Sequence, residues 1–281
     1  MKKIINLKSV RLMAFFVLMT LVFSCTKERV TNVEYYTDNE HIKSISMNDA
    51  IVHKYFYDDA GKIVEENCMS FFQKYLYDEN DRLVKIESAF DRSGLSSLAP
   101  QALRTEFMTS QNSTVDRYSL YEYDNAGRLS KIENYFNETG NGFEFRSMQT
   151  FEYNGLNIIR INWQNNIQAE TITSFEIYTY DNIGNVINEK SYSTYECTEP
   201  ELTSEISYKY DNYLNPFRIF SRLSSPGLYT NVNNIIETSV TRHMDVPGFD
   251  KYSTSKTTYQ YNEIGYPVKA IYGDSVEEYQ Y

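Results

Sequence analysis

The chain has 281 residues, of which 41% are hydrophobic and 15% aromatic, and its formal net charge is −11. This length and composition fit a globular protein that buries a core of its own. An acidic chain without a basic cluster is poorly suited to bind nucleic acid or an anionic lipid surface, so we expect neither as a partner.

The amino terminus has the pattern of a secretory signal. Four basic residues among the first 11 precede an apolar run from Leu12 to Phe23, which Ser24 and Cys25 follow. A membrane-spanning helix needs about 20 apolar residues, so this run is too short to span a bilayer. The five residues that end at Cys25, LVFSC, resemble a bacterial lipobox. The resemblance implies that residues 1–24 are removed and that Cys25 becomes the lipidated first residue; the alternative is ordinary secretion with an incidental cysteine.

A lipid on Cys25 would anchor the protein to a membrane surface without spanning it. One basic residue and one acid soon after Cys25 resemble part of the surface-export signal of Bacteroidetes lipoproteins. We therefore expect an outer-membrane location, with an outward-facing orientation as the finer expectation. The polar residues 25–41 predict a flexible tether. The remaining residues 42–281 are enough for a single β domain.

One pattern recurs seven times in that domain: an aromatic residue, any residue, an aromatic residue, Asp or Asn, a short turn and an aliphatic restart. Residues two apart on a strand share a face, so each aromatic pair lies on one side and the residue between them on the other. When the final half-copy is included there are eight such middle residues, and six of them are polar, which predicts one packed face and one wet face. The copies begin at Tyr55, Tyr75, Tyr121, Phe151, Tyr178, Tyr208 and Tyr259, and a half-copy, Tyr279-Gln280-Tyr281, ends the sequence.

The segment after each aromatic pair predicts a tight turn. Four copies place Gly three residues after the Asp or Asn, at Gly61, Gly127, Gly184 and Gly265. A type I turn favours Asp or Asn at its first position and Gly at its fourth. In the second copy Asp81 takes the glycine position, which Asp tolerates. Each copy is thus expected to be strand, turn and strand.

The complete run from Tyr121 to Leu129, Tyr-x-Tyr-Asp-x-x-Gly-Arg-Leu, resembles the YD repeat of Rhs and teneurin-type proteins. It also resembles repeats of Bacteroidetes lipoproteins with a porin-like β fold. The resemblance covers residues 50–281 and implies hairpins; this chain is too short for an Rhs toxin shell. We predict an all-β antiparallel meander of about 14–16 strands, forming a strongly bent sheet or a soluble barrel. The polar alternate face argues against a membrane-spanning barrel.

Two stretches interrupt the repeat. Residues 88–117 form a polar insertion with a helical turn near 98–108, and residues 243–255 contain a Pro-Gly bend. Long loops are either functional or disordered, and the composition of both stretches favours disorder. Cys68 and Cys197 lie far apart in sequence, and an oxidising compartment would permit a disulfide between them without establishing it.

The sequence shows no catalytic or metal-binding constellation. The three histidines are scattered and no Cys-x-x-Cys occurs, so neither a metal nor another cofactor is predicted. The pairs Glu65-Glu66 and Glu277-Glu278 have the residue type of glycosidase carboxylates. Because neighbours on a strand point to opposite faces, we interpret them as solvated charges. An enzymatic function is accordingly not expected.

Four residues are candidates for ligand binding. Trp163 lies among amide side chains and could stack on a sugar ring, although a structural role near a hairpin end is the alternative. The repeat tyrosines Tyr123, Tyr180 and Tyr210 could add aromatic surface. We predict a non-enzymatic cell-envelope lipoprotein that binds a glycan or a protein. The alternatives are a structural surface scaffold without a small ligand and an uncharacterised hydrolase; the oligomeric state is left open.

Overall fold

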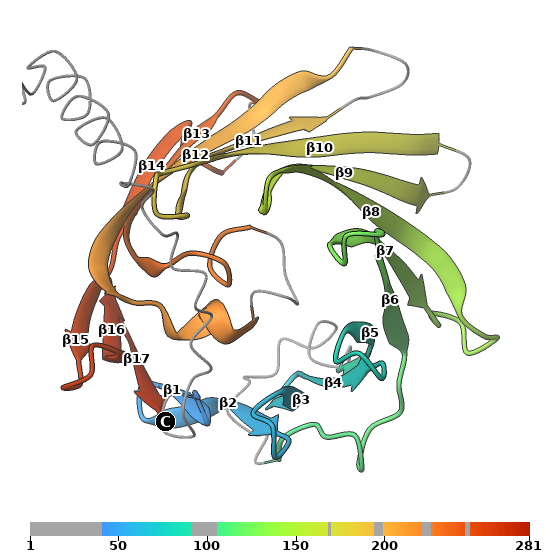
Figure 1. Ribbon diagram of the computed structural model, residues 1–281, viewed down its shortest axis with the longest axis horizontal. Coiled ribbons are helices and arrows are strands. Elements are labelled where there is room, and N and C mark those ends of the chain that lie inside the picture. The colour runs from blue at the N-terminus through green and yellow to red at the C-terminus, as the bar shows by residue number, and fades with distance from the viewer. Residues whose placement is uncertain (1–40, 92–105, 168–169, 194–198, 221–225, 245–247) are drawn as a thin grey trace, which may run out of the picture. The chain divides into compact units, whose positions relative to one another are not determined.

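Seventeen antiparallel strands, all within the described part of the chain, form a nearly closed barrel (Figure 1). The computed structural model describes residues 41–91, 106–167, 170–193, 199–220, 226–244 and 248–281. These residues belong to one compact unit that spans Tyr36–Tyr281. The predicted signal peptide, the candidate lipidation site Cys25 and almost all of the tether lie outside the described residues.

The strands follow one another around the barrel in chain order. Their bounds are β1 Ser44–Met47, β2 Ala50–Tyr57, β3 Ile63–Cys68, β4 Phe71–Tyr77, β5 Leu83–Phe90, β6 Arg117–Tyr123, β7 Leu129–Phe136, β8 Glu144–Asn154, β9 Asn157–Ile167, β10 Glu170–Tyr180, β11 Val186–Ser193, β12 Glu201–Leu214, β13 Asn233–Arg242, β14 Tyr252–Lys256, β15 Thr258–Tyr261, β16 Pro267–Tyr272 and β17 Ser275–Gln280. The helix η2, Pro216–Phe220, lies between β12 and β13.

Pairing is antiparallel throughout, which confirms the predicted all-β meander. From β1 to β14 each strand pairs with the next one in the chain, and so do β15, β16 and β17. The segments β14 and β15 are separated only by Thr257; β14 pairs with β13, and β15 pairs with β16. This division is one reason why the strand number exceeds the predicted 14–16.

The predicted turns are confirmed where the repeat is complete. In the first hairpin the amide of Gly61 donates to the carbonyl of Asp58 at 2.9 Å, and Gly61 has a φ of 76°. One carboxylate oxygen of Asp58 also accepts the amides of Ala60 and Lys62, at 3.0 and 2.9 Å. Asp81, at the glycine position of the second hairpin, has a φ of 60°. The Asp of the motif therefore caps the turn, and the fourth position needs a residue that tolerates positive φ.

Except for Tyr261, which bonds to the Asp211 carboxylate, the second aromatic residue of the repeat ties each hairpin to the one before it. Its hydroxyl donates a hydrogen bond to the carbonyl of the aliphatic residue that restarts the preceding hairpin. This bond joins neighbouring hairpins side by side, so the motif encodes contacts between repeats as well as within them. The pairs are Tyr77 to Ile63, Tyr123 to Leu83, Tyr153 to Leu129, Tyr180 to Ile158, Tyr210 to Val186 and Tyr281 to Pro267.

The two chain ends together complete the eighth repeat. The half-copy at the C-terminus lies on β17, which pairs with β1 in the register Ser44 to Gln280 and Ile45 to Tyr279. The hydroxyl of Tyr57 donates to the carbonyl of Ile42 at 2.8 Å, just as later tyrosines bond to the restart of the preceding hairpin. The segment that contains Ile42 and β1 thus serves as the second strand of the last repeat, and the ring closes there.

The outer face of the barrel is charged. Lysine and glutamate side chains lie directly opposite each other on adjacent strands and form ion pairs across them. Such pairs on one face of a sheet support the register and keep that face wet. They are Lys131–Glu122, Lys190–Glu205, Lys209–Glu237 and Lys269–Glu278, at 2.8, 3.6, 2.7 and 3.0 Å.

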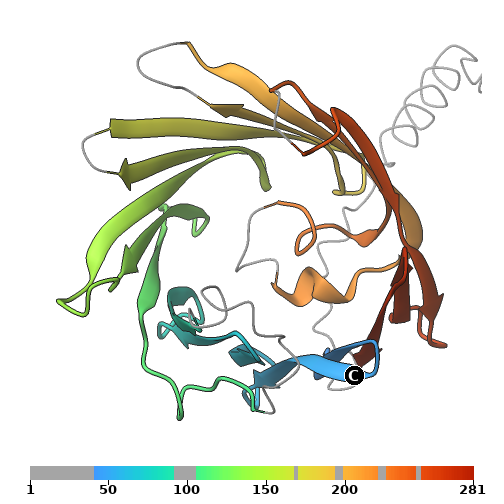
Figure 2. The ribbon, with the colours of Figure 1, turned by 180° about the vertical axis from the view of Figure 1, so that it is seen from behind.

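The inner face carries the aromatic pairs and surrounds a plug, which we define as η2 together with residues 226–232. Both views place η2 inside the ring (Figures 1 and 2). The ring of Phe220 lies 5.5 Å from that of Tyr55, and the ring of Phe217 lies 5.9 Å from that of Tyr279. The first aromatic residues of the repeats therefore pack against the plug as well as against each other.

Buried asparagines fasten the plug to the wall. The Asn185 side-chain oxygen, in the turn before β11, accepts the backbone amides of Val232 and Asn233 at 2.8 and 3.0 Å. In return the Asn231 side-chain oxygen accepts the amide of Val186 at 2.9 Å. Both asparagines are at most 1% exposed. Since buried backbone amides need partners, these bonds allow an irregular segment to lie inside the barrel.

Two parts of the predicted insertion 88–117 are described: residues 88–90 continue β5, and residues 106–117 pack on the outer face. Ser110 donates from its amide and its hydroxyl to the carboxylate of Glu65, at 3.0 and 2.8 Å. The Lys54 ammonium lies 4.5 Å from the ring of Phe107. The expectation of disorder is therefore wrong for this part of the insertion. Cys68 is a free cysteine, and Cys197 is outside the described residues. None of the helices in the described residues has the length and apolar character to cross a membrane.

Candidate functional site

A cavity with a volume of 610 Å³ lies at the turn end of the hairpins. Ligand sites commonly have volumes of about 300–1,000 Å³. We call it the arginine–tyrosine cavity because three tyrosines of the wall and three arginines line it. The arginines are two turn residues and one plug residue. These six residues are Tyr123, Tyr153, Tyr180, Arg82, Arg128 and Arg218.

The repeat motif itself builds this lining. The Arg that follows the turn stacks on the second tyrosine of the next hairpin: the guanidinium of Arg82 lies 5.2 Å from the ring centre of Tyr123, and that of Arg128 lies 4.6 Å from Tyr153. The Asp of its own turn orients each Arg. In the second hairpin, the Arg82 guanidinium lies 2.7 Å from the Asp78 carboxylate. The motif thus places alternating flat cations and flat rings along one end of the barrel.

The aspartates of these turns are held as carboxylates. Hydrogen bonds from the Arg82 backbone amide, and then from its side chain, lower the pKa of Asp78. The corresponding bonds from Arg128 lower the pKa of Asp124. The exposed Arg218 differs because no side chain among the described residues pairs with it. Arg218 is therefore the arginine of this cavity whose guanidinium can bind a ligand without losing an existing partner.

The four sequence-predicted ligand residues fall into two groups. Tyr123 and Tyr180 line the arginine–tyrosine cavity with their rings, while their hydroxyls bond to the preceding hairpin. Tyr210 makes the same kind of bond, to the carbonyl of Val186. Trp163 lies on the inner face of β9, where its indole nitrogen donates to Glu176 at 3.4 Å. Only the first two are therefore brought together in one cavity.

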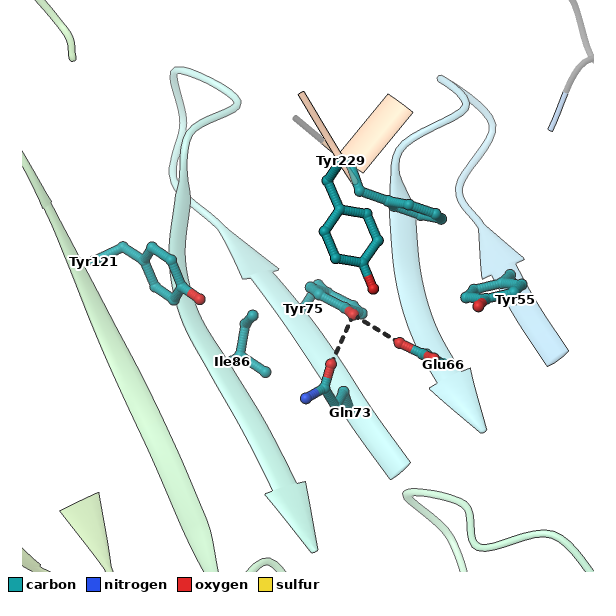
Figure 3. A pocket seen from close by; sticks show the side chains of 8 residues that line it. Tyr55, Glu66, Gln73, Tyr75, Ile86, Tyr121 and Tyr229 are labelled. Carbon is teal, nitrogen blue, oxygen red and sulfur yellow. Dashed lines mark hydrogen bonds between the residues drawn. The ribbon is translucent and has the colours of Figure 1, made fainter. Parts of the chain in front are cut away.

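A second site lies between the plug and a set of strands that includes β2–β4 and β15–β17. Two cavities of 410 and 240 Å³ share four lining residues: Tyr55, Glu66, Gln73 and Tyr229. We call the two cavities together the acidic chamber, because Glu66 lines both and Glu277 lines the larger. Figure 3 shows the Tyr75 hydroxyl of the smaller cavity between Gln73 and Glu66. This hydroxyl lies at hydrogen-bond distance from the side-chain oxygens of both, at 2.9 Å from Gln73 and 3.2 Å from Glu66.

Neutral hydroxyls hold both carboxylates of the chamber. Tyr272 and Tyr279 donate to Glu277, the latter at 2.8 Å. The Nδ1 atom of His53 lies 2.9 Å from Glu66, whose side chain is 14% exposed. Burial, and then the charge of Glu66, raise the pKa of the Tyr55 hydroxyl. Burial first, and then the negative charge of the carboxylates, therefore keep the tyrosines of the chamber protonated.

Sequence reasoning missed this chamber. It correctly placed neighbouring glutamates on opposite faces without assigning which of them faces inward. In the structure Glu65 and Glu278 are outside, whereas the interpretation of Glu66 and Glu277 as solvated charges was wrong. The available signal was the register: Glu66 pairs with the inward-facing Tyr55, and Glu277 lies two residues before Tyr279.

The described residues contain no group of three or more His, Cys, Asp or Glu side chains that could hold a metal ion.

Comparison with solved structures identifies the fold as that of porin-like β-barrel proteins. A porin-like protein from Bacteroides vulgatus aligns over 86% of this chain and 98% of its own, with a TM-score of 0.53 and 13% identity. A porin-like protein from Bacteroides uniformis aligns over 85% and 97%, with a TM-score of 0.37 and 12% identity. The Tc holotoxin pore of Photorhabdus luminescens aligns over 79% of this chain and 11% of its own, with a TM-score of 0.34 and 17% identity. No protein-family model and no curated protein matches. The first match shows the fold alone and confirms the porin-like β fold that the resemblance implied.

Proposed function

We propose that this protein is a lipid-anchored, non-enzymatic protein of the cell envelope that binds an acidic glycan in the arginine–tyrosine cavity. The observation that carries the proposal is the combination of three tyrosine rings and three guanidiniums in a single 610 Å³ cavity. Flat aromatic rings offer surfaces for sugar rings, and guanidinium groups bind carboxylates in a bidentate manner. A glycan that carries uronic acids presents both features.

The cell-envelope location is inferred from the lipobox-like sequence that ends at Cys25. The ion pairs on the outer wall, such as Lys209–Glu237 and Lys269–Glu278, support a barrel that faces water rather than lipid. A lipid-facing wall would instead need an apolar band about 25 Å tall. We therefore place the barrel beside the membrane, with the lipid on Cys25 as the anchor.

Isothermal titration calorimetry of the full-length protein in a neutral detergent tests the proposal. The ligands are oligogalacturonate and a neutral glucan of equal length. We expect binding of the acidic oligosaccharide alone and, for Arg218→Gln, about tenfold weaker binding, since a charge-assisted hydrogen bond contributes about 1.5–3 kcal/mol. The matched control Lys209→Gln removes one positive charge from the outer wall and should change the affinity less than twofold. Equal affinity of Arg218→Gln and the unmodified protein would refute the assignment.

The same samples test the absence of catalysis. An assay of reducing ends after long incubation should show no new ends, and their release would contradict the non-enzymatic part of the proposal.

A structural scaffold without a small ligand is the second candidate. It is supported by the hydroxyls of Tyr123, Tyr180 and Tyr210, which bond to the barrel backbone rather than to solvent. Absence of binding across both oligosaccharides would favour this scaffold.

A further inference from the structure

We propose that the acidic chamber is a second, separate binding site, which takes the ammonium group of a small organic cation. The site is formed by Glu66 and Glu277 together with the rings of Tyr55, Tyr229 and Tyr279, all of which line the larger cavity. It shares no lining residue with the arginine–tyrosine cavity, so the proposal does not depend on glycan binding.

The charge of the lining favours a cation. Two carboxylates line the chamber, and among its described lining residues the only basic side chain is that of His53, which already contacts Glu66. Glu277 accepts hydrogen bonds from two neutral tyrosines, and no cationic side chain of the described residues pairs with it. Removing a carboxylate from water is costly unless it is paired. A bound cation would supply the missing positive charge.

The aromatic surface of the chamber also favours a cation. The face of a phenol ring is negative because of its quadrupole, so cations bind over it. In the chamber, the wall supplies Tyr55, Tyr259 and Tyr279, and the plug supplies Phe217 and Tyr229. Rings from the wall and the plug, together with two carboxylates in the same lining, form the kind of environment in which proteins bind alkylammonium groups. The same lining repels anions and offers a neutral ligand no charge complementarity.

Packed aromatic rings hold the walls of the chamber in a fixed geometry. The ring contacts Phe217–Tyr279 and Phe220–Tyr55 hold the plug against the barrel, at 5.9 and 5.5 Å between ring centres. The 410 Å³ cavity lies beside these contacts and is bounded by packed side chains of the core cluster. A preformed cavity lowers the entropic cost of binding.

Choline and its neutral isostere 3,3-dimethyl-1-butanol provide the test, since they have nearly the same shape and differ in charge. We expect calorimetry of the full-length protein in a neutral detergent to show binding of choline and at least about tenfold weaker binding of the alcohol. Glu277→Gln should weaken choline binding by about tenfold, since it preserves the side-chain shape and removes the charge. Glu66→Gln should act in the same direction.

Glu278→Gln is the matched control. Glu278 is the neighbour of Glu277 on the outer face, where it pairs with Lys269 at 3.0 Å, so its replacement should change the choline affinity less than twofold. Thermal melts of the variants show whether each is folded before titration. Equal binding of choline and the alcohol, no binding of choline, or unchanged affinity in folded Glu277→Gln would each overturn the proposal. None of these outcomes bears on the oligogalacturonate titration.

Discussion

The buried tyrosines predict that the barrel unfolds in strongly alkaline solution, above about pH 10. Burial, and then the charge of Asp211, raise the pKa of Tyr259 to about 12, compared with 10.0 for an exposed tyrosine. Burial raises the pKa of Tyr153 to about 12 as well. The folded barrel therefore keeps protons on these hydroxyls at a pH at which the unfolded chain releases them.

The sign and the size of the effect follow from this difference. A raised pKa in the folded state gives stability that is fully present below pH 10 and is lost as the pH rises towards 12. Each pH unit corresponds to 1.36 kcal/mol, so Tyr259 alone lowers the free energy of unfolding by about 3 kcal/mol over this range. Burial also raises the pKa of Tyr55, Tyr178 and Tyr279. A domain is usually stable by only about 5–15 kcal/mol, so a few such residues are enough to unfold it.

The assay is an alkaline titration that follows tyrosinate absorbance and far-ultraviolet circular dichroism on one sample. We expect both signals to change together, in one steep transition between about pH 10 and 12. A smooth rise of tyrosinate absorbance with a midpoint near pH 10, while the β-sheet spectrum persists, would show that the hydroxyls reach solvent in the folded state. That result would refute the buried aromatic inner face.

Two further predictions concern the repeat itself. Tyr180→Phe keeps the ring and removes the hydroxyl that donates to the Ile158 carbonyl at 2.6 Å. It should therefore lower the free energy of unfolding, measured in urea, by about 1 kcal/mol. An unchanged urea midpoint would show that this bond contributes nothing to stability. Gly127→Ala should cost about 1–2 kcal/mol because Gly127 has a φ of 74° and open space around it. Gly61→Ala should cost more, since its Cβ would lie 3.0 Å from Nε2 of His41; equal losses in urea for the two alanine variants would contradict this steric reasoning.

The hairpins could be predicted from sequence because their determinants are local. The aromatic pair, the Asp and the Gly or Asp81 at positive φ lie within a few residues of one another, and each acts through neighbouring atoms. The closing strand could not be predicted in this way. The sequence of β1, Ser44–Met47, lacks the motif, and its role depends on pairing with β17 at the other end of the chain.

The plug and the acidic chamber depend on long-range contacts in the same way. The segment Leu214-Asn215-Pro216, which follows the sixth aromatic pair, leads into η2 inside the barrel instead of forming a tight turn. The long spacing between Tyr210 and Tyr261 was the available signal for an inserted segment. Glu66 and Glu277 become one site only because the ring closes, which no local pattern encodes. Tyr123 and Tyr180 were within reach of sequence reasoning, because they belong to the motif that builds their cavity.

The acidic chamber requires the ring to be closed, because Glu66 on β3 and Glu277 on β17 come together only across β1 and β2. Cysteine cross-linking of the closing strands tests this most directly. Ser44 is a register partner of both Gln280 on β17 and Lys54 on β2, and its hydroxyl donates to the Gln280 side chain at 2.9 Å. The background is a chain with Cys68→Ser and Cys197→Ser. In it we expect Ser44→Cys to form an intramolecular disulfide with Gln280→Cys in one variant and with Lys54→Cys in another. Adjacent strands bring Cα atoms within disulfide range. A disulfide with Lys54→Cys alone would contradict the closed ring.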